Sequence, residues 1–211
     1  RHTRYISVTG VQTCALPISG SSDGFVAVID LTKAGPSGLV YSTYFGGAQG
    51  EVLYDMARDS GGRYYIGGYT LSQNLTASDH FPISVDALNQ VSAGGGVDGF
   101  FAILDRTKGT NGLVYSSYVT GPGTQIVYAV DALPGGVAYA AGSATADIFP
   151  AGQPRHETAA GSTDGFILGM KFPALASLTA ALQDAVASDL TLPESAAPQP
   201  SDPAPSSPDA Q

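Results

Sequence analysis

Two stretches repeat one pattern: residues 23–44 read DGFVAVIDLTKAGPSGLVYSTY, and residues 98–118 read DGFFAILDRTKGTNGLVYSSY. They align with one gap in the turn, and a third Asp-Gly-Phe begins at Asp164. Self-similarity at a regular spacing is the signature of a repeat protein. The chain therefore contains successive copies of one structural unit.

The repeat extends beyond these stretches. Residues 53–70, LYDMARDSGGRYYIGGYT, are echoed by residues 127–145, VYAVDALPGGVAYAAGSAT, and we align the following His80-Phe81-Pro82 with Ile148-Phe149-Pro150. A Gly-Gly pair in each copy predicts a hairpin turn. Each unit thus holds four strand-like runs, expected in the best-covered unit at 52–58, 63–70, 98–105 and 112–119.

The strand that follows each Asp-Gly is almost uniformly apolar, as in Phe100-Phe101-Ala102-Ile103-Leu104. A strand exposed on one face alternates apolar and polar residues, whereas a strand covered on both faces does not. No helical pattern separates the strands, so a parallel α/β sheet is disfavoured. Tandem four-stranded antiparallel units predict an all-β fold, a partial β-propeller with about two blades present.

The motifs resemble the bacterial β-propeller repeat family known as SBBP. The matching residues are Asp23–Asp30, Leu39–Gly47, Asp59–Thr70 and Phe81-Pro82, and the second unit departs at Thr120 and Pro122. The resemblance covers about residues 20–172. It implies a secreted or surface-attached bacterial protein, and it carries over no catalytic residue.

Residues 1–19 share no pattern with the repeats. Val8–Ile18, VTGVQTCALPI, resembles the in-frame translation of a sequencing adapter, so we interpret 1–19 as an adapter-derived artefact and exclude it from the fold. This removes Cys14, the chain's one cysteine, from the argument. It also means that a signal peptide would not be visible.

The remaining chain divides by register and composition. Residues 23–47 are expected to form the outer half of a blade, 51–120 a full blade and 124–172 an incomplete blade, so we expect a fragment of a larger protein. Leu175, Leu178, Leu182 and Val186 have helical spacing and predict a short helix at 173–192. Residues 193–211 are rich in Pro, Ala and Ser and predict a disordered tail.

Composition argues against several partners. The net charge of −9, with few lysines, argues against nucleic acid and against an anionic membrane surface. No apolar run approaches the roughly 18 residues that span a bilayer.

Three groups of side chains are candidate sites. Asp23, Asp98 and Asp164 recur at one register, where they either bind calcium or another hard cation or, as we favour, cap turns. His80 and His156 are interpreted as exposed loop residues. The tyrosines either line a carbohydrate-binding surface or, as their recurrence favours, pack in the core and between blades; they include Tyr41, Tyr44, Tyr54, Tyr64, Tyr65, Tyr69, Tyr115 and Tyr118.

The favoured hypothesis is a non-enzymatic extracellular or cell-surface scaffold that presents loops to proteins or glycans, without a cofactor. The alternative is a propeller-borne glycan hydrolase or lyase whose active site lies in missing blades. The two hypotheses differ in whether carboxylates or histidines converge at one end of the central channel.

Overall fold

The computed structural model describes residues 12–14, 21–76, 80–148 and 161–172. The expected helix at 173–192, the expected tail at 193–211, His156 and most of the segment 1–19 lie outside these residues. Within them the fold is all-β, with ten strands and two short 3-10 turns. They are β1 (Gln12–Cys14), β2 (Gly24–Ile29), η1 (Gly35–Gly38), β3 (Leu39–Phe45), β4 (Glu51–Arg58), β5 (Tyr64–Thr70), β6 (Asp98–Leu104), η2 (Arg106–Asn111), β7 (Leu113–Val119), β8 (Gln125–Leu133), β9 (Val137–Ala144) and β10 (Asp164–Lys171).

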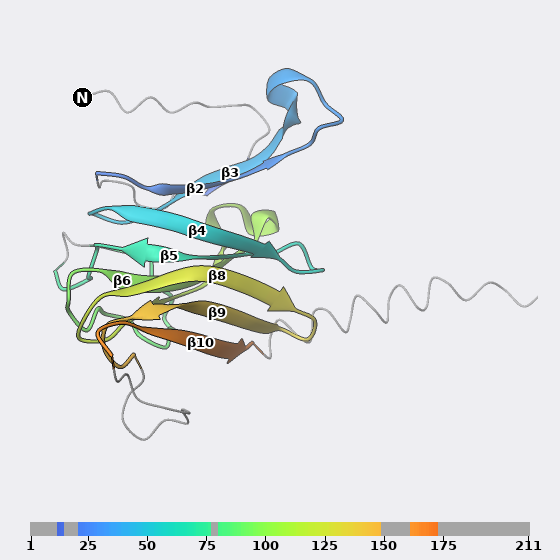
Figure 1. The fold of residues 1–211 in the computed structure, drawn as a ribbon. Helices are drawn as coiled ribbons and strands as arrows, with labels where there is room; N and C mark the ends of the chain where they lie inside the picture. Colours follow the sequence, from blue (N-terminus) through green and yellow to red (C-terminus); the bar gives the residue numbers. More distant parts are fainter. Residues whose placement is uncertain (1–11, 15–20, 77–79, 149–160, 173–211) are drawn as a thin grey trace, which may run out of the picture.

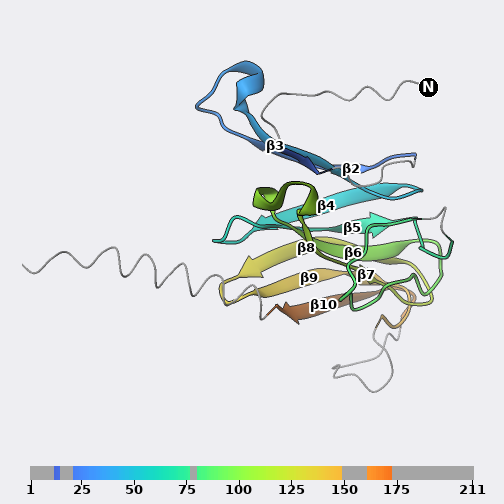
Figure 2. The same ribbon diagram turned by 180° about the vertical axis from the view of Figure 1, so that it is seen from behind.

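The strands form three separate open sheets, stacked as layers in Figures 1 and 2. The middle sheet has the order β4-β5-β6-β7, and all its pairs are antiparallel. The third sheet has the order β10-β9-β8, and the first has the order β1-β3-β2. The four strands predicted in the best-covered unit are confirmed within one residue at either end. Antiparallel all-β architecture is therefore confirmed, and no sheet is closed on itself.

The strand β1 differs from expectation, because its residues were excluded from the fold. It pairs in parallel with β3, with Gln12 opposite Tyr41. A backbone ladder uses only N–H and C=O groups and requires no particular side chains. The pairing is therefore compatible both with an adapter origin of residues 12–14 and with their being part of the natural protein.

Two kinds of turn recur in the repeats. Gly62, Gly135 and Gly136 have φ of 84°, 80° and 72° and close the predicted hairpins β4–β5 and β8–β9, because glycine adopts positive φ without steric cost. After β2 and β6, an aspartate accepts a hydrogen bond from the backbone N–H two residues on. The distances are 3.0 Å from Thr32 N to Asp30 Oδ1 and 2.9 Å from Thr107 N to Asp105 Oδ1.

The Phe-rich strand of the middle sheet is buried on both faces, as predicted. Every residue of β6 is buried. The equivalent strands at the two ends of the stack are exposed, as expected for a fragment that leaves apolar blade faces uncovered: Phe25 in β2 is 69% exposed and Ile167 in β10 is 75% exposed. The middle sheet is the layer with a neighbour on each side, whereas the first and third sheets each have one uncovered face.

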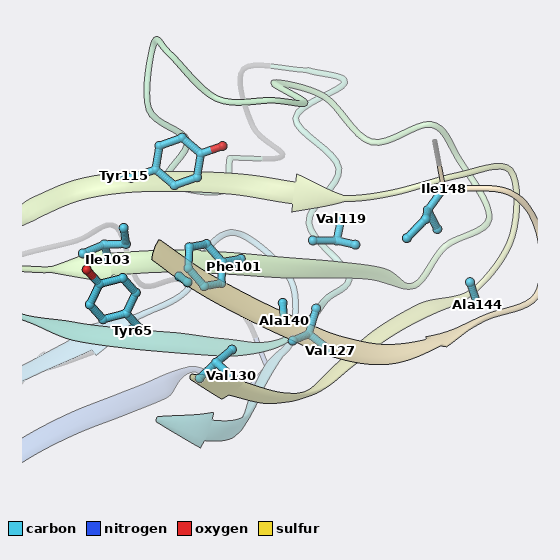
Figure 3. Packing of buried hydrophobic residues seen from close by; sticks show 11 residues of the cluster. Tyr65, Phe101, Ile103, Tyr115, Val119, Val127, Val130, Ala140, Ala144 and Ile148 are labelled. Atoms are coloured by element: carbon cyan, nitrogen blue, oxygen red, sulfur yellow. The ribbon is translucent and has the colours of Figure 1, made fainter. Parts of the chain in front are cut away.

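Consecutive sheets pack through the same two faces. In β6, Phe100 faces the first sheet, in a cluster with Val26 and Phe45, and the Phe45 and Phe100 ring centroids are 5.3 Å apart. Phe101 faces the third sheet, in a cluster with Val127 and Ala140 (Figure 3).

The flanking sheets follow the same rule. In β10, Phe166 stands at the repeat position of Phe100 and packs toward the middle sheet. In β2, Val26 stands at the position of Phe101 and also faces the middle sheet. The stack is therefore head-to-tail.

One repeat position provides a stability test of this packing. Phe100→Ala removes a fully buried ring and is expected to lower the free energy of unfolding by about 3–5 kcal/mol. Phe25→Ala, at the same position of the first sheet, is expected to cost less than about 1 kcal/mol. Urea denaturation of the full chain measures both. Equal costs would show that the outer face of the first sheet is covered in solution.

Candidate functional site

Two half-exposed tyrosines are placed by a repeated irregularity at the edges of the sheets. In the pairing of β4 with β5, Leu53 lies opposite Gly68 and Asp55 opposite Gly67, so Tyr54 is the extra residue of a β-bulge. The pairing of β8 with β9 leaves Tyr128 extra in the same way. A bulge reorients a side chain and ends regular pairing at an edge.

These tyrosines form a continuous aromatic surface with a third one, Tyr69 of β5. The ring centroids of Tyr54 and Tyr128 are 5.2 Å apart, and those of Tyr54 and Tyr69 are 6.0 Å apart. Tyr54 and Tyr128 are each 48% exposed. We call Tyr54, Tyr69 and Tyr128 the tyrosine row.

A hydrogen bond between the middle and third sheets holds the two bulged strands together. Asp55 Oδ2 accepts from Val130 N at 2.9 Å, and Asp55 Oδ1 accepts from Met56 N at 2.8 Å. Gly67 lies beside this contact, and a Cβ added there would meet the side chain of Val130 at 2.7 Å. The absence of a side chain at Gly67 therefore lets β8 approach β5 closely.

The other tyrosines divide between the core and the outer faces. The predicted packing role is confirmed for the buried ones, which are Tyr41, Tyr64, Tyr65, Tyr115 and Tyr118. Tyr44 and Tyr139 are exposed on the uncovered faces of the first and third sheets. Tyr54 and Tyr128 recur at one repeat position but lie at the strand edges, so recurrence alone did not separate them from core residues.

Two carboxyl groups, those of Asp23 and Glu51, lie together where the start of β2 meets the start of β4. We call this contact between the first and middle sheets the first joint. Glu51 is buried, and its Oε1 accepts from Thr70 Oγ1 at 2.6 Å and from Ser72 Oγ at 2.9 Å. Its Oε2 accepts from Gly47 N at 2.9 Å. Burial raises the pKa of Asp23, and the charge of Glu51 and a hydrogen bond to it raise that pKa further.

The equivalent contact between the middle and third sheets, which we call the second joint, has the same backbone hydrogen bond but different side chains. Gln125 N donates to Val97 O at 3.0 Å, as Glu51 N donates to Ser22 O at 2.9 Å, so Gln125 replaces Glu51. Asp98 is fully buried there and accepts a hydrogen bond from Thr120 Oγ1. Burial raises the pKa of Asp98, although hydrogen bonds from Ser92 and Thr120 oppose the rise.

The three recurring aspartates thus have three different environments. Asp23 lies beside Glu51, Asp98 beside Thr120, and Asp164 Oδ2 accepts from Gly161 N at 3.0 Å, which is a turn-capping contact. Between residues 21 and 172, in the described ranges, no three or more His, Cys, Asp or Glu side chains gather as a metal site would require.

The position of His80 corrects the alignment of the repeats. A Cβ on Gly47 would lie 2.1 Å from His80 O, and one on Gly121 would lie 2.2 Å from Asp147 O. Phe81 and Ile148 are both buried in equivalent clusters. His80 therefore corresponds to Asp147 and not to Ile148, because the backbone approach to glycine fixes the register. The His80 side chain is exposed, as expected.

A comparison with protein-family models gives no match to this chain, and a comparison with curated proteins gives none either. The resemblance to the SBBP repeat and the adapter origin of residues 1–19 therefore remain predictions.

The first joint predicts a pH effect. A raised pKa in the folded state means that Asp23 stabilises the fold below its unfolded pKa of about 3.9, and that this contribution is lost as pH rises through the folded pKa. Glu51→Gln copies the second joint and removes the neighbouring charge. We expect the pKa of Asp23 to fall, and the variant to lose less stability than the wild type as pH rises through this range.

NMR titration of the Asp23 carboxyl carbon and urea denaturation across this pH range measure the two effects. The readout is the pH dependence and not the absolute stability, because the single carbonyl oxygen of the new amide cannot replace both carboxylate oxygens that accept from Gly47, Thr70 and Ser72. Asp98 is the internal control, since its pKa is raised by burial. An Asp23 pKa unchanged by Glu51→Gln would contradict the prediction.

Proposed function

We propose that this chain is part of a non-enzymatic extracellular scaffold built from β-propeller repeats, which binds proteins or glycans. The observation that carries the proposal is the head-to-tail stacking. At both interfaces, the sheet face that carries Phe100 or its repeat equivalent packs against the face of the preceding sheet that carries Phe101 or its repeat equivalent. A head-to-tail interface generates a ring when its rotation closes and an open stack when it does not. Radial repetition of four-stranded antiparallel sheets is the propeller architecture.

The uncovered faces support a need for further repeats. Tyr65 is 1% exposed in the middle sheet, whereas Tyr139 at the same repeat position of the third sheet is 42% exposed. Phe25 and Ile29 are likewise exposed on the first sheet. Apolar faces of this kind cost stability in water and are usually covered by a neighbour. A closed ring covers both ends of the stack with the same contacts.

The extracellular location rests on the resemblance to secreted repeats and on the acidic, lysine-poor composition. In the described part of the chain, no helix is both long and apolar enough to cross a membrane.

The carboxyl pair of the first joint does not have the arrangement of a glycosidase active site. A glycosidase places two carboxyl groups about 5–9.5 Å apart with the sugar between them. Glu51 is instead buried within the joint, and its oxygens already accept from Thr70, Ser72 and Gly47. The pair is therefore built to connect sheets.

Electron microscopy of the full-length natural protein tests the architecture. We expect a disc of radially arranged sheets around a central channel, because the same interface recurs along the stack. An open, elongated stack would contradict the propeller, and confinement of the protein to the cytoplasmic fraction would contradict the extracellular location. Release of reducing ends from a polysaccharide panel would favour the hydrolase instead.

A further inference from the structure

We propose that the tyrosine row is a binding site for an uncharged glycan chain. The inference rests on the proposed scaffold function and specifies its ligand. Tyr54, Tyr69 and Tyr128 come from three strands of two sheets, the edge strands β4 and β8 and the interior strand β5, and their rings are adjacent.

The row is not needed to fill the core. The clusters between the sheets are made by other residues, among them Tyr65, Phe101 and Tyr118, and none of the row belongs to either cluster. Tyr54 of the middle sheet and Tyr128 of the third sheet contact each other, yet each residue is 48% exposed. About half of the surface of each of these two residues is thus available to a ligand.

The strands that carry the row are fixed against one another before any ligand binds. The hydrogen bond from Val130 N to Asp55 fixes β8 against β4, and the close approach at Gly67 fixes β8 against β5. Tyrosine has two side-chain torsions, so ordering it costs little entropy. A preorganised aromatic surface of this kind loses little free energy on binding.

Charge selects the ligand class. The chain carries a net charge of −9, which disfavours nucleic acids and acidic polysaccharides. The bulge at Tyr54 interrupts the edge of β4, and Asp55 occupies the Val130 N–H on β8, so an added peptide strand would find a broken ladder.

A neutral sugar chain matches the remaining chemistry. Its C–H faces can lie on the tyrosine rings, and its hydroxyl groups can exchange hydrogen bonds with phenolic oxygens, because tyrosine combines an apolar body with a polar tip.

The test uses the full chain and soluble neutral polysaccharides, namely xyloglucan, laminarin, dextran and a mannan, with alginate as the anionic comparison. Affinity gel electrophoresis measures retardation, and tyrosine fluorescence gives the dissociation constant, since the chain has no tryptophan. We expect at least one neutral polysaccharide to bind and alginate not to bind.

Matched variants locate the site. Tyr54→Ala with Tyr128→Ala is expected to weaken binding about 10-fold or more, because aromatic anchors carry most of the binding energy at such sites. Tyr54→Phe with Tyr128→Phe keeps the rings and is expected to retain most of the affinity. Tyr44→Ala and Tyr139→Ala are the controls, since these exposed tyrosines lie outside the row and are expected to leave binding unchanged.

Three results would overturn the proposal: no binding to any neutral polysaccharide, binding retained by the double alanine variant, or an equal loss in the two controls. If the double alanine variant does not fold, NMR shifts of the Tyr54 and Tyr128 rings in the wild type decide, and unchanged shifts at saturation overturn the site. The outcome is separable from the propeller test, because a ring can exist without glycan binding, and the row is complete within two described sheets.

Discussion

Burial of both faces of the Phe-rich strand is the constraint on which the structure depends. β6 can consist of apolar residues alone only if another sheet covers each side, and the first and third sheets provide these covers. Because the flanking sheets carry the same sequence pattern, each of them requires two neighbours as well. Stacking is thus a property of the repeat itself. In the described stack, the two end sheets each lack one of the two neighbours.

Strand positions could be predicted from the sequence because the repeat supplies its own alignment. Gly-Gly pairs, Asp-Thr turns and an uninterrupted apolar run recur in order, and each has a local physical cause. Exposure follows from the number of neighbouring sheets and not from the local sequence, since Phe25 and Phe100 have the same sequence context and differ in what lies opposite them. The bulges were also invisible, because a single extra residue inside a strand leaves no gap between the repeats when both copies contain it.

The two joints show how one backbone geometry accepts different chemistry. Glu51 and Gln125 begin equivalent strands and receive equivalent backbone hydrogen bonds, but only the first joint places two carboxyl groups together. The sequence comparison could have paired Glu51 with Gln125. It could not have placed either beside the aspartate of the preceding sheet, because that contact depends on the stacking. Of the candidate site, the aspartates were thus foreseen as residues but not as parts of a joint.

The tyrosine row arises from the same requirement that protects the strand edges. An edge strand exposes unpaired N–H and C=O groups, and a bulge together with a carboxylate acceptor prevents another chain from pairing there. At β4 and β8 the bulge inserts one additional residue, and the side chains of these residues, Tyr54 and Tyr128, are half-exposed and contact each other. Tyrosine tolerates this half-exposed position, since its ring packs on the neighbouring ring while its hydroxyl meets water. Repetition of the sheet then repeats the tyrosine, so a device that limits aggregation also produces an ordered aromatic surface.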